Sequence, residues 1–289
     1  MSKFTIVTDS SCDLPVDIVN QMNIHVVPMN IVMDGKSYKH YHDYRELSSD
    51  DYYSKLRSGC TGSTAGTNIE DAMDVMRPIL KSGNDILYLS LSSGLSCSYQ
   101  NACLAAEELA EEYPGRKIKI VDTRSVCGGV ALLVYLTAKC QNAGATLEEA
   151  YDFAMKTRMK IHHSFVVDDL SAIQRSGRIS HLAAFVGSVI GVKPILAIGA
   201  DGKVQNTGKV RGRKAGLKQI LTNAQNTVTD AQAFAICHAD TIADAESMKT
   251  QILAQHPNAD VIFCQIGPVI GINTGINTIA TICLGEERQ

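Results

Sequence analysis

The stretch Ser92-Ser93-Gly94-Leu95-Ser96 combines hydroxyl side chains with a glycine, a combination that suits the binding of an anion. It follows the apolar run Ile86–Leu89 and precedes a helical pattern over residues 99–112. A helix N-terminus offers unpaired backbone N–H groups and partial positive charge, and glycine lets a ligand approach the backbone. We therefore expect this loop to hold a carboxylate or a phosphate without a basic side chain.

Two further segments repeat this pattern. Thr61-Gly62-Ser63-Thr64 leads to a helix that Asn68 caps, and Gly271-Ile272-Asn273-Thr274-Gly275 follows a strand ending at Gln265. Each segment alone is more often a simple helix cap. Open α/β sheets, however, bind ligands at the edge where such loops lie. If the three loops converge, they form the polar end of an otherwise apolar pocket.

The same serines permit a second interpretation, in which Ser93 or Ser96 is a nucleophile. A serine nucleophile needs an adjacent base, and no His or Asp is assignable to either serine from the sequence. The pattern G-x-S-x-G is absent. A lipid hydrolase or acyltransferase that uses Ser93 remains the alternative function.

Other chemistries have little support. Neither a Walker A sequence nor G-x-G-x-x-G occurs, so no motif indicates nucleotide binding. The histidines in His40-Tyr41-His42-Asp43 and His162-His163 chelate a metal only if the fold adds further ligands, and we interpret them as polar loop residues. We expect no metal and no cofactor.

Composition limits the class of protein. The chain has 289 residues, enough for two domains, with 45% hydrophobic residues, 20% charged residues and a net charge of -3. This charge gives no overall field for nucleic acid or an anionic membrane. The nine cysteines are scattered without a CxxC pair, which indicates reduced thiols in a cytoplasmic protein. Met1-Ser2-Lys3 runs straight into a strand, so we expect no signal peptide, and the apolar stretch Leu182–Val192 is too short for stable membrane insertion.

Strands and helices alternate along the chain. The first part reads as strands separated by helices, with a capping box at Thr146-Leu147-Glu148-Glu149. The predicted strands cover residues 4–8, 24–32, 86–91 and 118–121. From about His163 the pattern restarts, with a hairpin over Asp201-Gly202. This order predicts an α/β fold with a mainly parallel sheet covered on both faces in residues 1–160 and a second α/β domain in residues 161–289.

The chain resembles the DegV family, and in particular its fatty-acid-binding FakB type. The resemblance runs nearly end to end and rests on several motifs in the same order. Residues 8–11 resemble the family's TDSS, residues 91–100 its LSSGLSGTYQ, residues 167–170 its VDDL and residues 176–180 its GGRIS. Further along, residues 193–196 resemble KPIL, residues 201–203 DGK and residues 209–211 KVR.

The resemblance implies a monomeric carrier rather than an enzyme. Family members bury one long-chain fatty acid between two α/β domains. The FakB-type members present its carboxylate to a separate ATP-dependent kinase, and the acyl phosphate formed feeds bacterial phospholipid synthesis. The carboxylate is held by the Thr and Ser loops. The matching positions in this chain are Thr61, Ser92, Ser93, Gly94, Asn273 and Thr274.

Two motifs depart from the family pattern. Only Thr61 carries over from the family's TSQPS loop, and Asn273 stands where the family's GTHTGPG has its histidine. Asparagine donates hydrogen bonds but carries no positive charge and shuttles no proton. Any electrostatic role of the family histidine is therefore open in this chain.

Two remaining features have both a functional and an ordinary interpretation. The stripe Leu182, Ala183, Phe185, Val186, Val189 and Ile190 either lines an acyl tunnel or is simple core. Arg178 and Arg211, with Arg213 and Lys214 nearby, are either a solvated face or a basic cluster. In the functional interpretation this cluster docks the kinase or places charge near the head group.

Overall fold

A computed structural model describes residues 3–168, 170–178 and 191–289. The first sheet has the order β2-β1-β6-β7, and all its neighbours are parallel. Its strands are β1 (Phe4–Asp9), β2 (His25–Val27), β6 (Asp85–Ser90) and β7 (Ile118–Asp122). β1 and β6 are buried at every residue, as expected for strands covered on both faces. The predicted parallel sheet is confirmed.

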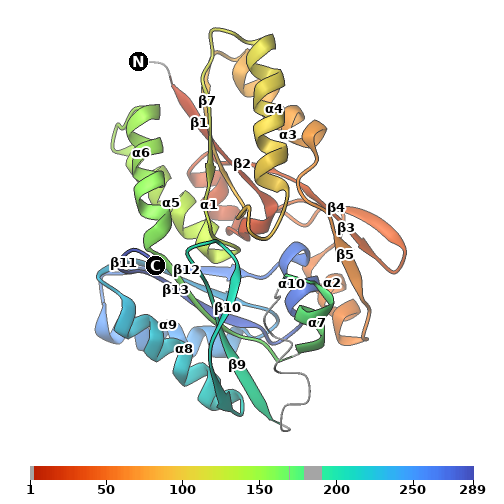
Figure 1. Cartoon of the computed structure of the whole chain (residues 1–289), viewed down its shortest axis with the longest axis vertical. Coiled ribbons are helices and arrows are strands. Elements are labelled where there is room, and N and C mark those ends of the chain that lie inside the picture. Colours follow the sequence, from red (N-terminus) through yellow and green to blue (C-terminus); the bar gives the residue numbers. More distant parts are fainter. Residues whose placement is uncertain (1–2, 169, 179–190) are drawn as a thin grey trace.

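Helices cover both faces of this sheet (Figure 1). One face packs against α3 (Ile69–Lys81) and α4 (Ser98–Glu112), the other against α5 (Gly128–Asn142) and α6 (Leu147–Thr157). The Thr146–Glu149 capping box that opens α6 is present. Nearly every residue in the first three turns of α5 is buried, because this helix also contacts the second sheet.

The second sheet is six-stranded, in the order β10-β9-β8-β13-β11-β12. Its strands are β8 (Ile161–Val166), β9 (Val192–Ile198), β10 (Val204–Arg211), β11 (Asp230–His238), β12 (Asp260–Gln265) and β13 (Ile279–Leu284). Only β11 and β12 pair in parallel. The outer face packs against α8 (Arg213–Thr227) and α9 (Ile242–Gln255), while α5 lies on the inner face. The molecule is thus a mixed α/β protein in which α5 lies between two sheets.

Short elements surround the space between the two sheets. A three-stranded sheet, β4-β3-β5, consists of β3 (Met29–Met33), β4 (Lys36–His40) and β5 (Gly62–Thr64). The short helices are α1 (Val16–Gln21), α2 (Ser49–Arg57), α7 (Leu170–Arg175) and α10 (Pro268–Thr274), with single 3-10 turns at Ser10–Cys12 and Arg158–Lys160. Within the described ranges, no helix has the length and apolar character needed to cross a bilayer.

Two predicted segments differ in the structure, and a third lies outside its described residues. The predicted strand over residues 24–32 is two strands, because Pro28 has no N–H to continue the ladder. Residues 271–275 were expected as a loop, but most of them lie in α10, which Pro268 opens at its first position and Gly275 ends with φ 79°. The apolar stripe over residues 182–190 lies outside the described residues.

Candidate functional site

An apolar cavity lies between the inner face of the six-stranded sheet and the loops that follow β6 and β7. The empty space between its atoms amounts to about 910 Å³ when the open mouth is included. The described apolar lining comes from several elements, and includes Met29, Leu91, Leu95, Val126, Phe165, Ile173, Val204, Ile266, Val269, Ile270, Ala280 and Ile282.

One end of the cavity is polar and opens into a wider groove. Thr64, Ser176, Arg178 and Asn273 line both spaces, so they mark the mouth. The groove beyond is lined largely by polar side chains and glycines, Thr61 among them. A ligand with one polar end and a long apolar body fits this division.

Thr64 and Asn273 are joined across the mouth. The Asn273 amide donates to the Val269 carbonyl at 2.8 Å and to Thr64 Oγ1 at 3.4 Å. Because the Thr64 oxygen accepts this bond, its own proton remains available to a ligand. Asn273 was predicted from the sequence, whereas Thr64 was named only as part of its loop.

Ser96 supplies a second hydroxyl to the cavity lining. Its oxygen lies 2.9 Å from Ser98 Oγ and accepts the Ser98 N–H at 3.2 Å. Ser98 Oγ in turn accepts the Thr67 N–H at 3.0 Å, which ties this loop to the loop after β5. One residue from each of the three predicted hydroxyl segments, Thr64, Ser96 and Asn273, therefore lines the same cavity.

Ser92, Ser93 and Gly94 have other contacts, and none of them is among the described lining residues. The buried Ser92 hydroxyl donates to the Gly202 carbonyl at 2.8 Å. The exposed Ser93 hydroxyl donates to Asp122 Oδ2 at 2.6 Å. This segment therefore holds the β9–β10 turn against the end of β6.

The surroundings of Ser93 bear on the nucleophile interpretation. Asp122 accepts from Ser93 and also from Arg124 Nε at 3.0 Å. No hydrogen bond in the described ranges joins Ser93 to a histidine. The imidazole base of a hydrolytic triad is thus not placed at this serine.

The remaining predicted residues fall around the mouth and on one surface. Thr61 lines the groove, and Thr274 lines the cavity with its hydroxyl donating to the Ile270 carbonyl at 3.3 Å. Arg178 is exposed at the mouth. Arg211 is exposed at the end of β10, where pairing with Val192 puts it on the same face of the sheet as Pro194 and its partner Lys209.

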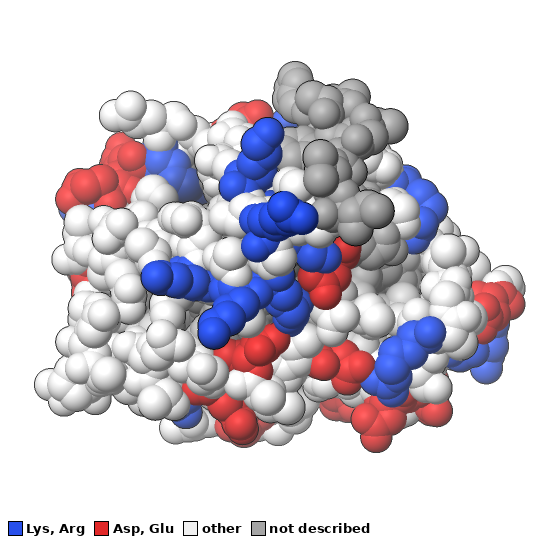
Figure 2. Space-filling view, turned by 90° about the horizontal axis from the view of Figure 1, so that it is seen from below, with Lys and Arg blue, Asp and Glu red and all other residues white. Residues whose placement is uncertain are grey.

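Figure 2 shows Lys and Arg side chains gathered on the face seen from below, with acidic side chains at its margin. The exposed basic residues of β10 and α8 are Lys209, Arg211, Lys214 and Lys218, which we call the basic surface.

Among the described residues that line the inner wall of the cavity, none carries a positive charge. His163 lines it, and burial lowers the pKa of this histidine to about 3, so the ring is neutral at physiological pH. Its Nε2 faces the Val126 carbonyl at 3.3 Å. Searching the described side chains finds no cluster of three or more His, Cys, Asp or Glu that could hold a metal ion.

Comparisons with known proteins agree with this architecture. A DegV domain-containing protein of Clostridium perfringens is 37% identical over 100% of both chains, and one of Streptococcus pyogenes is 32% identical over 99% of both. A fatty-acid-binding DegV protein of Thermus thermophilus has a TM-score of 0.86 at 27% identity, covering 98% of this chain and 99% of its own.

Two further structures are similar. A fatty-acid-binding DegV protein of Streptococcus agalactiae has a TM-score of 0.85 at 26% identity, covering 99% of this chain and 100% of its own. A stearic acid-binding protein of Eubacterium ventriosum shares the fold, with a TM-score of 0.88 at 22% identity over 97% and 98% of the two chains. The sequence profile described as "Uncharacterised protein, DegV family" matches residues 3–286. The chain belongs to the DegV family.

Proposed function

We propose that this protein binds one long-chain fatty acid, with the acyl chain in the apolar cavity and the carboxylate at its mouth. The observation that carries the proposal is the apolar cavity that ends in Thr64, Asn273 and Arg178. The fatty acids bound by the Thermus thermophilus and Streptococcus agalactiae relatives support it. Each buried methylene contributes about 0.8 kcal/mol, so the acyl chain alone supplies ample affinity.

The head group is held by neutral donors in this proposal. Thr64 offers its hydroxyl proton at the mouth, where the Asn273 amide orients its oxygen, and Ser96 offers a second hydroxyl on the cavity lining. A hydrogen bond to a charged group contributes about 1.5–3 kcal/mol. Arg178 is exposed at the mouth, where its charge favours a carboxylate.

We further propose that the bound carboxylate is presented to a separate ATP-dependent kinase, which forms the acyl phosphate. The groove gives a large partner access to the mouth. The sequence has no nucleotide-binding motif of its own, which agrees with a cytoplasmic carrier that uses another protein's ATP site. The basic surface around Arg211 is the proposed docking site.

The test is the mass of the purified protein. Native mass spectrometry should show one added fatty acid, and a denaturing extraction should release and identify it. Protein stripped of lipid should take up palmitate or oleate again. A protein that arrives empty and takes up neither acid does not have the proposed function.

A further inference from the structure

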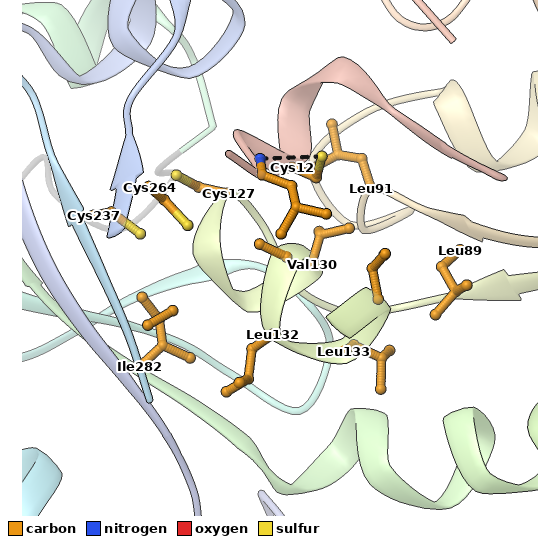
Figure 3. Close-up of a cluster of buried hydrophobic side chains, with 14 of the residues drawn as sticks. Cys12, Leu89, Leu91, Cys127, Val130, Leu132, Leu133, Cys237, Cys264 and Ile282 are labelled. Carbon is orange, nitrogen blue, oxygen red and sulfur yellow. Dashed lines mark hydrogen bonds between the residues drawn. The ribbon is translucent and has the colours of Figure 1, made fainter. Parts of the chain in front are cut away.

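Three cysteines from three different elements meet at the inner wall of the cavity. Cys127 precedes α5, Cys237 lies in β11 and Cys264 in β12. Figure 3 shows their sulfur atoms close together between the start of α5 and the second sheet. Cys127 and Cys237 line the cavity, while Cys264 is buried behind them. The proposed ligand therefore touches two thiols.

The contacts of Cys237 favour its ionised form. The neighbouring Cys127 and Cys264 side chains and the Gly128 N–H lower the pKa of the Cys237 thiol against the effect of burial. The fit is close, because a Cβ at Gly128 would lie 2.4 Å from Cys237 Sγ. A thiolate, rather than a thiol, is the nucleophile in cysteine chemistry.

Two groups beside Cys237 hold protons, the Cys127 thiol and the Asp13 carboxyl group. The Cys127 thiol donates to Asp13 Oδ2 at 3.0 Å, and burial raises the pKa of the Asp13 carboxyl well above its usual range. Cys127 itself has φ 51° and ψ −129°, a backbone conformation that favours glycine and costs about 1–3 kcal/mol. This strained residue lies in the cavity lining.

We propose that Cys237 forms covalent adducts with electrophilic acyl chains, namely fatty acids that carry an α,β-unsaturated ketone within the chain. This proposal rests on the proposed fatty acid binding. The thiols line the cavity but not the groove, whereas the carboxylate is assigned to the mouth. An activated carboxyl group would therefore lie away from the sulfur, and only an electrophile within the chain can reach it.

The reaction needs no further reactant. The Cys237 sulfur forms a bond to the β-carbon of the enone, and the electron pair of the carbon–carbon double bond moves to the α-carbon as an enolate. The proton lost from the Cys237 thiol returns to the α-carbon, and the Cys127 thiol, which also lines the cavity, relays it. The product is a saturated ketone in thioether linkage, equal in mass to the protein plus the acid.

The experiment uses the full-length protein stripped of lipid and an oxo-octadecadienoic acid as the enone probe. Denaturing mass spectrometry should show the mass of one acid added, and peptide mapping should place it on Cys237. Cys237→Ala should reduce the adduct at least tenfold. Cys283→Ala is the matched control, because Cys283 is equally buried but lies on the outer face of the sheet, with its thiol toward the Ala224 carbonyl.

Two further measurements use the unmodified protein, so their results do not depend on whether the variants fold. Stearic acid in excess should block labelling of the unmodified protein, and the alcohol analogue of the probe should bind without forming an adduct. Binding of stearic acid with no adduct, or an adduct on the exposed Cys97, would overturn this inference and leave the proposed function intact. Failure to bind stearic acid at all would instead overturn the proposed function.

Discussion

At the scale of single residues, the head-group assignment depends on Thr64. Thr64→Val keeps the shape of the side chain and removes the donor, so fatty acid affinity should fall by about 1.5–3 kcal/mol, roughly a factor of 10 to 150. Thr61→Val is the control, because Thr61 lines only the outer groove. Displacement of a fluorescent fatty acid measures both variants. Equal losses in the two would move the carboxylate outward into the groove.

Ser93 provides a complementary prediction. Its hydroxyl donates to the nearly buried Asp122, so Ser93→Ala leaves that carboxylate with one partner fewer. We expect a loss of about 1–3 kcal/mol in the free energy of unfolding and unchanged fatty acid affinity. Urea denaturation and the displacement assay measure the two effects separately. A large loss of affinity in a stable protein would restore Ser93 as a ligand of the carboxylate.

His163 makes the stability depend on pH. Its pKa is about 3 in the folded protein and about 6.5 when unfolded, so between these values only the unfolded chain binds the proton. The free energy of unfolding therefore falls by about 1.4 kcal/mol per pH unit below pH 6.5 on account of this group. His163→Gln should lose about 2 kcal/mol less than wild type between pH 6.5 and pH 5. Identical pH profiles would mean that the pKa of His163 is the same in the folded and unfolded states.

The site residues show which parts of the candidate site could be predicted from the sequence. The hydroxyl-rich loops and Asn273 were recognisable because their residue types suit an anion. Which hydroxyl of a loop faces the cavity depends on tertiary contacts. Thr64 faces inward because β5 pairs with β3, and Ser92 faces away because it bonds to the Gly202 carbonyl. Neither partner is close in sequence.

At the scale of elements, the β9–β10 hairpin is held against the loop after β6 through a close approach at Gly94. A Cβ there would lie 2.7 Å from the Asp201 carbonyl oxygen and 3.0 Å from Gly202. Gly94→Ala should therefore reduce the free energy of unfolding by about 1–3 kcal/mol. Gly115→Ala is the control, because nothing lies within 4 Å of its Cβ position. Thermal unfolding that is unchanged in Gly94→Ala would show that this contact yields easily.

Pattern and capping chemistry predicted most elements. Buried strands, the Asp201-Gly202 turn and the α6 capping box all have local signals. α10 was missed, because its seven residues contain one glycine, Gly271, and two residues of low helix propensity, Asn273 and Thr274. The helix forms because Gly271 lets it pack closely on Tyr52 of α2. Tertiary packing of this kind overrides local preference.

The basic surface on β10 and α8 is the element proposed to meet the kinase. Arg211→Ala should slow acyl phosphate formation by the cognate kinase, because charges at an exposed interface act mainly on the association rate. Fatty acid binding and thermal stability should remain unchanged. Lys81→Ala, an exposed charge at the end of α3, is the control. Turnover of Arg211→Ala equal to wild type at both low and high salt would remove this surface from the interface.

At the scale of the whole molecule, Arg288 links the two sheets and their connecting segments. Its guanidinium donates to the Arg124 and Arg158 carbonyls, both at 2.9 Å. It also donates to the Ile198 and Gly199 carbonyls at 3.2 and 3.1 Å. Arg124 and Arg158 precede the proposed boundary near residue 160, whereas Ile198 and Gly199 follow it. The sequence gives no sign of this, because Gly285-Glu286-Glu287-Arg288-Gln289 is typical of a solvated tail.

Arg288→Met tests whether this residue couples the two halves in unfolding. The variant keeps much of the buried stem but leaves carbonyls of both halves without a donor, and we expect a loss of at least about 2 kcal/mol in the free energy of unfolding. Calorimetry of the variant should also show two separable transitions where the wild type shows one. Glu287→Ala, at the exposed neighbouring position, should behave like wild type. If Arg288→Met is less stable but still unfolds in a single transition, the packing of α5 between the two sheets suffices to couple them.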